Sequence, residues 1–444
     1  MTKLDTVLAM GREQVIPREG EAAYLKEVAE KVLEKVRAAA AQFKEVRGTV
    51  LGGSFAKETW ISDGPRAYAD IDIFVKIAKD VDDKRFESIG LRIGREASRG
   101  YKHGKKYAQH PYTEAMVDGV KVNIVPCYDV RPGHWKSAAD RSPYHVKFVK
   151  KNLDEEKRLQ VRMLKRFMKT VGVYGAEIES EGFSGYAAEV LIHNHGTLEG
   201  VLRHFAGLEP AGETFFSLKD PIDADRELAK AISRETVTRM VLASRALLEK
   251  PLADYFTGIP RNVRKGLTGR LFVIRFDHAP LSEDTLWGEL KRTTRQIVRY
   301  IEARGFDVFR ASAASNNSDK SAIIVFPVVV RLPELEERVG PAVEMAAEVR
   351  NFIAKNRRSS ELTWAGDDGR VHILQRRAKT ELAGLLRGVL RSEIESLGAS
   401  REMGASIHKN GRVVTGRELR REMSKEGWLR EGVDEILADT IGTD

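Results

Sequence analysis

Two short segments, Gly52–Thr59 and Asp70–Val75, constrain the fold and chemistry of this chain more than any other part of the sequence. The second segment carries Asp70 and Asp72 two positions apart. On a β-strand, residues i and i+2 face the same side, so the two carboxylates are predicted to project together while the apolar residues beside them pack on the other face. Paired carboxylates next to a glycine-serine turn can hold a divalent metal against a nucleoside triphosphate. The pattern is typical of a nucleotidyltransferase that needs no template.

Length and composition favour a basic enzyme of several domains. A chain of 444 residues is too long for one ordinary core, so we expect about three domains. The hydrophobic content of 42% is enough to pack them. The net charge of +9 and a pI of about 9.3 favour a polyanionic partner, although a basic enzyme without RNA would show the same charge.

Cysteine content and hydropathy indicate the compartment. The chain has one cysteine, Cys127, which excludes an intrachain disulfide and a structural zinc site of the multi-cysteine kind. Met1–Arg18 is mixed and charged, without the apolar core of a signal peptide. No apolar run is long enough to span a bilayer. We therefore expect a cytoplasmic protein with no membrane partner.

Hydrophobic periodicity and turn residues predict an α/β N-terminal part. In chain order, the expected elements are a helix over Glu21–Phe43, a strand at Thr49–Leu51, a short helix capped by Ser54 and ending at Trp60, a strand over Asp70–Ile77, a helix over Arg85–Tyr101, and a hairpin over Val117–Val125 that turns at Asp118-Gly119.

The rest of the chain is predicted to be a helical region followed by a smaller α/β region. A stripe at Leu159, Met163, Phe167 and Val171 indicates an amphipathic helix capped by Gly172. Further expected elements are helices over Phe183–His195 and Arg234–Glu249, a linker over Gly258–Gly269, a strand over Arg270–Phe276, a helix over Glu283–Arg304, a strand within Ser321–Val330, a hairpin turn at Asn410-Gly411, and mostly helix over Arg417–Ile441. The β-α-β order resembles an RNA-recognition fold without its usual aromatic signature. The predicted domains are residues 1–150, 151–265 and 266–444.

An ordered series of motifs resembles the class I, or archaeal-type, CCA-adding enzymes, which are tRNA nucleotidyltransferases. The series covers residues 50 to about 230 densely: Gly53–Trp60, Asp70–Phe74, Tyr107–Tyr112, Val125–Tyr128, Ser142–His145, Gly172–Glu177, Gly182–Tyr186 and Asp220–Arg226. The resemblance implies a polymerase-β-like nucleotidyltransferase head, a helical central domain, and a C-terminal α/β region with an RNA-recognition-like module that binds tRNA and forms a homodimer.

The resemblance also implies a reaction and its residues. An RNA 3′-hydroxyl attacks the α-phosphate of CTP or ATP, with Mg²⁺ as the cofactor and the acceptor arm and 3′ end of tRNA as the partner. Asp70 and Asp72 are the expected metal ligands, against the alternative of two solvated acids on a strand. The expected nucleotide contacts are Gly53, Ser54, Lys57, Ser142, His145, Lys165, Tyr174 and Arg226. Lys165 lies off the apolar stripe of its helix and is expected to point into a cleft, whereas Arg226 could instead pair with Asp223 or a neighbouring acid.

Asn123 is the main departure from the family pattern. It stands where the family carries a third carboxylate, on the polar face of its expected strand. We still predict it as a catalytic and metal-site position, but asparagine offers only a neutral carbonyl ligand and cannot act as a base. Losing such a base costs about two to four orders of magnitude in rate. Either an active enzyme's aspartate was replaced to trap substrate, which we favour, or the natural protein has lost or slowed its chemistry.

Two other functions are compatible with these residues. A degenerate nucleotidyltransferase would grip tRNA without adding nucleotides, even after Asn123→Asp. A poly(A) or oligoadenylate polymerase of the same superfamily would add long A tails or ignore CTP. We prefer CCA addition because the match extends past the shared catalytic core into the central helical region.

Overall fold

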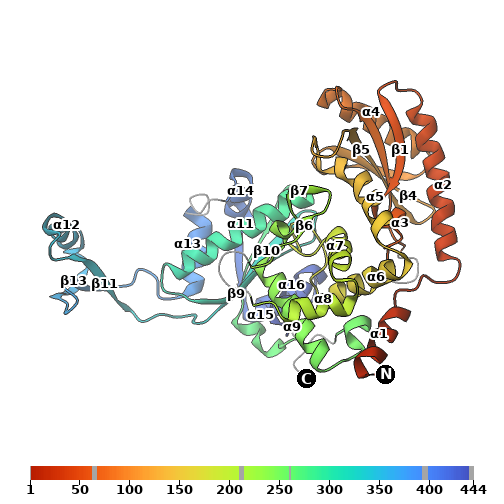
Figure 1. Cartoon of the computed structure of the whole chain (residues 1–444). Coiled ribbons are helices and arrows are strands. Elements are labelled where there is room, and N and C mark those ends of the chain that lie inside the picture. Colours follow the sequence, from red (N-terminus) through yellow and green to blue (C-terminus); the bar gives the residue numbers. More distant parts are fainter. Residues whose placement is uncertain (1, 63–67, 210–214, 260–261, 393–398, 440–444) are drawn as a thin grey trace. The chain divides into compact units, whose positions relative to one another are not determined.

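The computed structural model describes residues 2–62, 68–209, 215–259, 262–392 and 399–439. The chain divides into two compact units, of which the first includes the described residues up to 259 and the second residues 262–439. Each unit is described by itself below, and both are drawn in Figure 1. Among the described residues, no helix has both the length and the apolarity needed to cross a membrane.

The first unit begins with a mixed five-stranded sheet in the order β1-β2-β5-β4-β3. Its elements are α2 (Glu21–Ala40), β1 (Val46–Gly52), α3 (Gly53–Lys57), β2 (Ile71–Ala78), α4 (Asp83–Ala97), β3 (Lys102–Tyr107), β4 (Pro111–Val117) and β5 (Val120–Asp129). β2 and β5 run parallel, and the other neighbours are antiparallel. This is the expected nucleotidyltransferase head.

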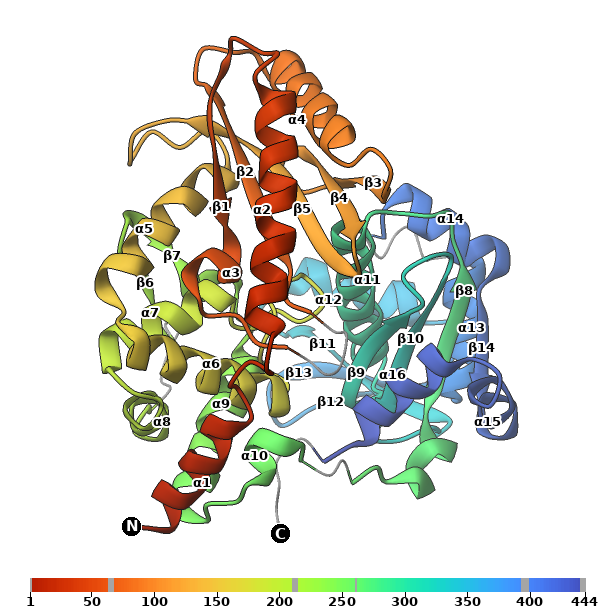
Figure 2. The same cartoon turned by 90° about the vertical axis from the view of Figure 1, so that its right-hand side faces the viewer.

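One face of this sheet is closed by helices. α2 runs across the sheet, as Figure 2 shows, and packs with α4 on the apolar face of β2 and β5. Ile71, Ile73, Val122 and Ile124 are fully buried in this core. Because side chains alternate along a strand, the polar residues between them must emerge on the opposite face. The sheet therefore directs Asp72 and Asn123 away from the helices.

The expected hairpin is confirmed. β4 and β5 pair up to Val117 and Val120, which leaves Asp118 and Gly119 as the two-residue turn. Both have positive φ, 51° and 80°, as a type I′ turn requires. The hairpin fixes the register between the two strands, and so decides which side chains of β4 lie beside Asn123.

The remainder of the first unit is mostly helical. Its elements are α1 (Lys3–Glu13), the 3-10 helix η1 (Ala138–Arg141), α5 (Ser142–Asn152), α6 (Glu155–Thr170), α7 (Gly185–His195), α8 (Leu198–Ala206), β6 (Lys219–Asp220), β7 (Asp223–Glu227), η2 (Leu228–Ala231), α9 (Arg234–Glu249) and α10 (Asp254–Thr257). The predicted stripe of α6 packs in the core of these helices, where Phe167 is fully buried. Gly172 follows α6 with φ of 71°, as the expected C-terminal cap requires.

The second unit contains the expected RNA-recognition-like module. Its elements are η3 (Lys265–Arg270), β8 (Phe272–Asp277), α11 (Glu283–Glu302), β9 (Val308–Ser315), β10 (Lys320–Pro327), β11 (Leu335–Ala342), α12 (Ala346–Asn356), β12 (Ser360–Ala365), β13 (Arg370–Arg376), α13 (Leu382–Ser392), α14 (Arg401–Asn410), β14 (Arg412–Thr415), α15 (Gly416–Met423) and α16 (Gly427–Leu437). β8, α11, β9, β10, the helices α13 and α14, and β14 give a β-α-β-β-α-β order, with antiparallel sheet order β14-β8-β10-β9.

Both faces of this four-stranded sheet are covered. α11, α13 and α14 close one face, and α15 and α16 close the other. An RNA-recognition domain stacks bases on its open sheet face. That face is buried here, which explains why the aromatic signature is absent. A separate three-stranded sheet, β11-β13-β12, with α12 is inserted between β10 and α13.

Some local predictions were wrong. Asn410-Gly411 is not a hairpin turn, because Asn410 ends α14 and its side chain binds the backbone of Asp277 on the neighbouring strand. Ser54 does not cap α3, since Gly52 is the N-cap and the helix begins at Gly53; it ends at Lys57 rather than at Trp60. The expected helix end at Ile441 and residues 260–261 of the expected linker lie outside the described residues.

Candidate active site

The predicted carboxylates lie on the open face of the head sheet. β2 and β5 pair so that Asp72 lies opposite Asn123, and the Asn123 amide Nδ2 donates to Asp72 Oδ1 at 2.9 Å. Asp70 immediately precedes β2, and its Oδ2 lies 2.5 Å from Lys121 Nζ. Burial raises the pKa of Asp72 above its usual value, and the charge of Asp70 adds to the increase although the Asn123 hydrogen bond opposes it. These polar side chains form one group, as strand periodicity predicts.

Gly53 brings the glycine-serine loop against this group. Its φ is +63°, and a Cβ added there would lie 1.8 Å from Asp72 Oδ2. Only glycine allows the loop backbone to approach a carboxylate this closely. Ser54 lies in the first turn of α3, and its carbonyl accepts from the Thr59 N–H at 3.0 Å. The loop and strand β2 thus form one packed structure.

Lys57 and Lys165 belong to a buried cluster around Glu189 of α7. Lys57 Nζ lies 2.6 Å from Glu189 Oε2, and Lys165 Nζ lies 3.7 Å from Glu189 Oε1. Lys165 also donates to the carbonyl of Thr59 at 2.8 Å, while the Thr59 hydroxyl donates to Glu189. Lys165 is only 1% exposed, so the expectation that it points freely into a cleft was wrong.

Opposite charges explain how these ionisable side chains can be buried together. Burial lowers the pKa of Lys165 to about 8. Burial alone would raise the pKa of Glu189, but the charges of Lys57 and Lys165 hold it below its usual value. Two cations around one carboxylate leave a net positive charge directly behind the loop. The cluster therefore fixes the loop to the helical part and favours an anion in front of it.

A second polar cluster is centred on Asp220 of β6. His145 Nε2 and Arg226 Nη1 lie 3.2 and 3.1 Å from Asp220 Oδ2, and the Tyr186 hydroxyl donates to Oδ1 at 3.0 Å. The rings of His145 and Tyr186 stack with centroids 3.6 Å apart. Burial lowers the pKa of His145 below its usual value, so the ring is neutral near pH 7. Lys57 lies 5.5 Å from the Tyr186 ring centroid, which links the two clusters.

The other predicted contacts lie nearby, and Arg226 pairs with an acid close to it in sequence. Arg226 pairs with Asp220, whereas Asp223 is held by Arg141 at 2.7 Å. Ser142 begins α5, three residues before His145. Tyr174 is partly buried against the helical core. The Arg141–Asp223 pair joins positions 82 residues apart and was not visible in the spacing, whereas Asp220 and Arg226 lie six residues apart within one motif.

Sequence reasoning assigned no role to four residues that hold the site together. These are Thr59, Lys121, Tyr186 and Glu189. Thr59 lies in the Gly53–Trp60 motif and Tyr186 in the Gly182–Tyr186 motif, so the sequence did point to these two residues. Lys121 could have been found from strand parity, because it shares the polar face with Asn123.

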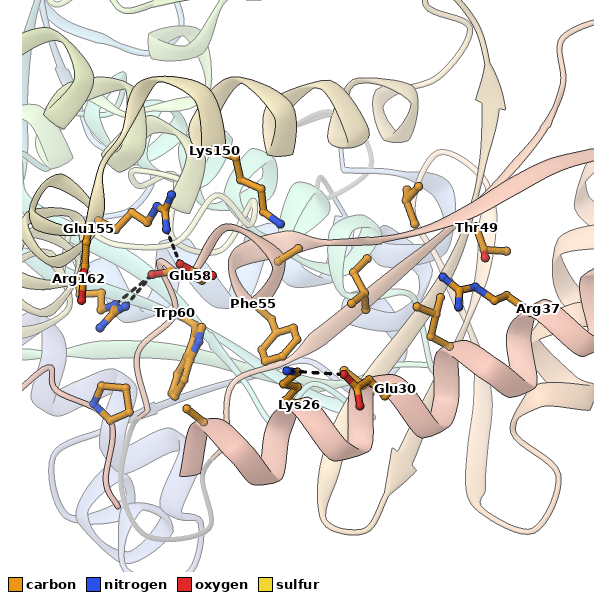
Figure 3. Close-up of a pocket in the computed structure, with 18 residues that line it drawn as sticks. Lys26, Glu30, Arg37, Thr49, Phe55, Glu58, Trp60, Lys150, Glu155 and Arg162 are labelled. Atoms are coloured by element: carbon orange, nitrogen blue, oxygen red, sulfur yellow. Dashed lines mark hydrogen bonds and ion pairs between the residues drawn. The ribbon is translucent and has the colours of Figure 1, made fainter. Parts of the chain in front are cut away.

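A cavity of about 790 Å³ lies apart from the carboxylates, between α2, β1, α3 and α6. Figure 3 shows Phe55 and Trp60 lining it, together with Lys26 and Glu30 of α2. Arg162 donates to the Glu58 carbonyl at 2.9 Å at one end. Residues of α3 and of the turn after it form part of the cavity wall. Neither Asp70 nor Asp72 lines the cavity.

Comparison with known proteins identifies the parts of the chain. Family models match as a nucleotidyltransferase domain over residues 30–145, a tRNA nucleotidyltransferase second domain over residues 159–257, and a CCA-adding enzyme C-terminal domain over residues 268–416. The CCA-adding enzyme of Pyrobaculum islandicum is 32% identical over 93% of this chain and 100% of its own length.

Other relatives agree. The CCA-adding enzyme of Methanopyrus kandleri is 29% identical over 98% of this chain and 97% of its own length. The CCA-adding enzyme of Pyrobaculum neutrophilum is 33% identical over 88% of this chain and 94% of its own length. Among solved structures, a cytoplasmic RNA terminal U-transferase aligns with a TM-score of 0.43 and 12% identity, over 58% of this chain and 99% of that chain. That structural likeness is too low to carry an argument.

Proposed function

The chain belongs to the family of CCA-adding enzymes, and we propose that the carboxylate face of its head sheet is where nucleotides are joined to RNA. It is a tRNA nucleotidyltransferase that adds the 3′-terminal CCA without a nucleic-acid template. A bond forms between the RNA 3′-oxygen and the α-phosphorus of CTP or ATP. The bond from that phosphorus to the β-phosphate oxygen breaks, pyrophosphate leaves, and the 3′-hydroxyl proton is released. Such a displacement depends on position and on charge neutralisation.

Asp70, Asp72 and Asn123 suit a divalent cation, for which we propose Mg²⁺. The supporting observation is the Asn123 carbonyl oxygen Oδ1, which is buried and has no hydrogen-bond partner within the part of the chain that the structure describes. A buried polar atom without a partner is costly, and a hard cation would satisfy it. Mg²⁺ would polarise the α-phosphate and lower the pKa of the attacking hydroxyl. The protein's part is to hold the carboxylates in one group beside the loop.

We propose that the triphosphate lies between the glycine-serine loop and the Asp220 cluster. Gly53 and Ser54 offer backbone N–H groups, while His145, Ser142 and Arg226 stand on the other side. Tyr174 remains a proposed nucleotide contact at the edge. Lys57 and Lys165 contribute positive potential from behind the loop, because Glu189 holds both ammonium groups.

We propose tRNA as the partner through its acceptor arm and 3′ end, and the cytoplasm as the compartment because tRNA and nucleoside triphosphates occur there. The net charge of +9 supports binding to a polyanion. We also propose a homodimer formed through the second unit. Apolar side chains are exposed around β11 and α12, namely Leu335, Val339, Val343, Met345 and Leu362.

The dimer is tested by light scattering at micromolar protein. Val339→Asp should shift the mass toward the monomer. Ile16→Asp is the control, because it places the same charge on an exposed apolar residue of the first unit. Equal masses for wild type and Val339→Asp would contradict the proposed interface.

The function is tested by incorporation of labelled CMP and AMP into tRNA that lacks its 3′ CCA. Wild type should add C, C and A with Mg²⁺. Asp70→Ala or Asp72→Ala should lower the rate by about 10³-fold or more, while tRNA binding measured by filter retention stays close to wild type. A wild-type chain that binds tRNA and adds nothing would instead be a degenerate tRNA-binding protein, and long A tails would indicate a poly(A)-type polymerase.

A further inference from the structure

Asn123 stands in the middle of a row of side chains that crosses three strands. The β2–β5 register places Asp72 on one side of it, and the β4–β5 register places Glu114 on the other. Paired residues of neighbouring strands point to the same face, with Cβ atoms about 4.5–5.5 Å apart in an antiparallel pair. Thr113 and Ala115, the neighbours of Glu114 along β4, are buried on the opposite face. Glu114 therefore shares the open face with Asp72 and Asn123.

The Glu114 carboxylate is not held in place. It is half-buried, and within the described ranges of the chain it forms no hydrogen bond or ion pair. Its charge acts on Lys121, which also lies on this face. Burial alone would lower the pKa of Lys121, but its hydrogen bond to Asp70 and the charges of Asp70 and Glu114 raise it. Its side chain is therefore free to turn toward a cation on this face.

We propose that Glu114 supplies the third carboxylate of the metal site, in place of the one that Asn123 lacks. This inference rests on the proposed function. Glutamate has one more methylene than aspartate, which suits a position one strand farther from Asp72. Asn123 lies between the two acids and adds its free carbonyl oxygen. The chain would thus reach the charge of a three-carboxylate site with its third acid on β4 rather than β5.

One movement is required. Among the described residues, no three acidic, imidazole or thiol groups stand close enough to hold a metal ion. The Glu114 side chain must therefore turn toward Asp72 when a cation arrives. The rotation is about ordinary single bonds between staggered positions and breaks no hydrogen bond. Lys121 must share or leave the Asp70 carboxylate in the same step, since it lies 2.5 Å from Oδ2.

The test is Mn²⁺ binding to the free protein by calorimetry and by electron paramagnetic resonance, without nucleotide or tRNA. Glu114→Gln should weaken Mn²⁺ binding at least about tenfold. The matched control is Glu96→Gln, which removes the same charge from the exposed side of α4 in the same domain. It should bind Mn²⁺ as wild type does.

A second substitution that restores Mn²⁺ binding shows whether Glu114 is a metal ligand or only contributes negative charge. In the Glu114→Gln background, Asn123→Asp should restore Mn²⁺ binding, because it returns a carboxylate beside Asp72. Met116→Asp in that background restores the charge on the same strand face, two residues from position 114, and should not rescue. Equal rescue by both would reduce Glu114 to a charge that balances Lys121, and would overturn the proposal.

Two further outcomes would also overturn it. These are Mn²⁺ binding by Glu114→Gln that equals that of Glu96→Gln, and wild-type binding no tighter than that of Asp72→Asn. Nucleotide incorporation is measured separately on the same variants. If wild type binds Mn²⁺ through Glu114 but adds no CMP or AMP to tRNA, the metal assignment stands and the proposed function fails.

Discussion

Replacing Gly53 by alanine tests the contact between the glycine-serine loop and strand β2, the proposed phosphate- and metal-binding segments. The substitution adds one methyl group at a position with φ of +63°, 1.8 Å from Asp72 Oδ2. Two costs follow. The backbone must hold an alanine in a left-handed conformation, and either the loop or the Asp72 carboxylate must move away.

The two costs differ in size and in what they affect. The left-handed alanine should cost about 1–2 kcal/mol of folding free energy, which lowers Tm by about 2–4 °C per kcal/mol in a unit of this size. Restoring an ordinary contact requires Asp72 or the loop to move by more than about 1 Å, and misplacement on that scale costs about 10²-fold in rate. Catalysis should therefore fall far more than stability.

Gly20→Ala is the matched control. Gly20 has φ of +75°, and a Cβ added there meets nothing within 4 Å. It therefore carries the backbone cost without the collision. The assay is kcat/KM for CMP incorporation, with Tm from calorimetry for each variant. We expect similar losses of Tm and a loss of kcat/KM only in Gly53→Ala. Values of kcat/KM for the two variants within about threefold of each other would refute the reasoning.

Three other predictions concern charges in the site. Asp72→Asn should abolish incorporation yet raise Tm near pH 7, because burial raises the pKa of Asp72 and makes its ionised form costly; the gain should disappear as the pH falls below 3.8, where the carboxyl is protonated in both folded and unfolded states. Calorimetry across pH checks this, and a constant gain would contradict it. Glu189→Gln leaves the buried Lys57 and Lys165 without a counter-charge. Urea denaturation should show that the free energy of unfolding falls by about 3–5 kcal/mol. Lys121→Met should tighten Mn²⁺ binding in titration calorimetry, because it removes a cation that competes for Asp70; weaker binding would mean that Lys121 supports the site.

The local features of the head were predictable from the sequence because they depend on neighbouring residues. Strand alternation placed Asp72 and Asn123 on one polar face, and the structure joins them by a hydrogen bond of 2.9 Å. The residue types at positions 118 and 119 predicted a two-residue turn, which requires positive φ at both. The alternation of side chains along a strand determines the first feature, and the residue types in the turn determine the second.

Features that depend on packing between distant segments were not predictable in this way. Periodicity identifies one apolar face of α6 and leaves Lys165 outside it, but α7 covers that side as well and brings Glu189 to it. A helix enclosed on two sides can bury a lysine that a single-face pattern assigns to solvent. Asn410 illustrates the same limit, since its partner on β8 lies 133 residues away in sequence. Among the missed site residues, Glu189 is of this long-range kind, since its partners Lys57 and Thr59 lie 132 and 130 residues away in sequence.

Considered by itself, Asn123 indicates a loss of catalytic activity. The residues packed around it instead favour a site that can still hold a metal ion. Gly53 and Asp72 are packed together at a cost, since a buried carboxylate with a raised pKa destabilises the fold when it ionises. A protein that only grips tRNA gains nothing from this arrangement, because the carboxylate repels RNA phosphates as well. The cost is understandable if a cation occupies the face, since it would neutralise the carboxylate and satisfy the free Asn123 oxygen together. Glu114 then offers a third explanation of Asn123, besides an aspartate replaced to trap substrate and a loss of chemistry. A third acid already present on β4 would make the asparagine part of a rearranged metal site, and the unmodified chain would not need an aspartate at position 123 to add nucleotides.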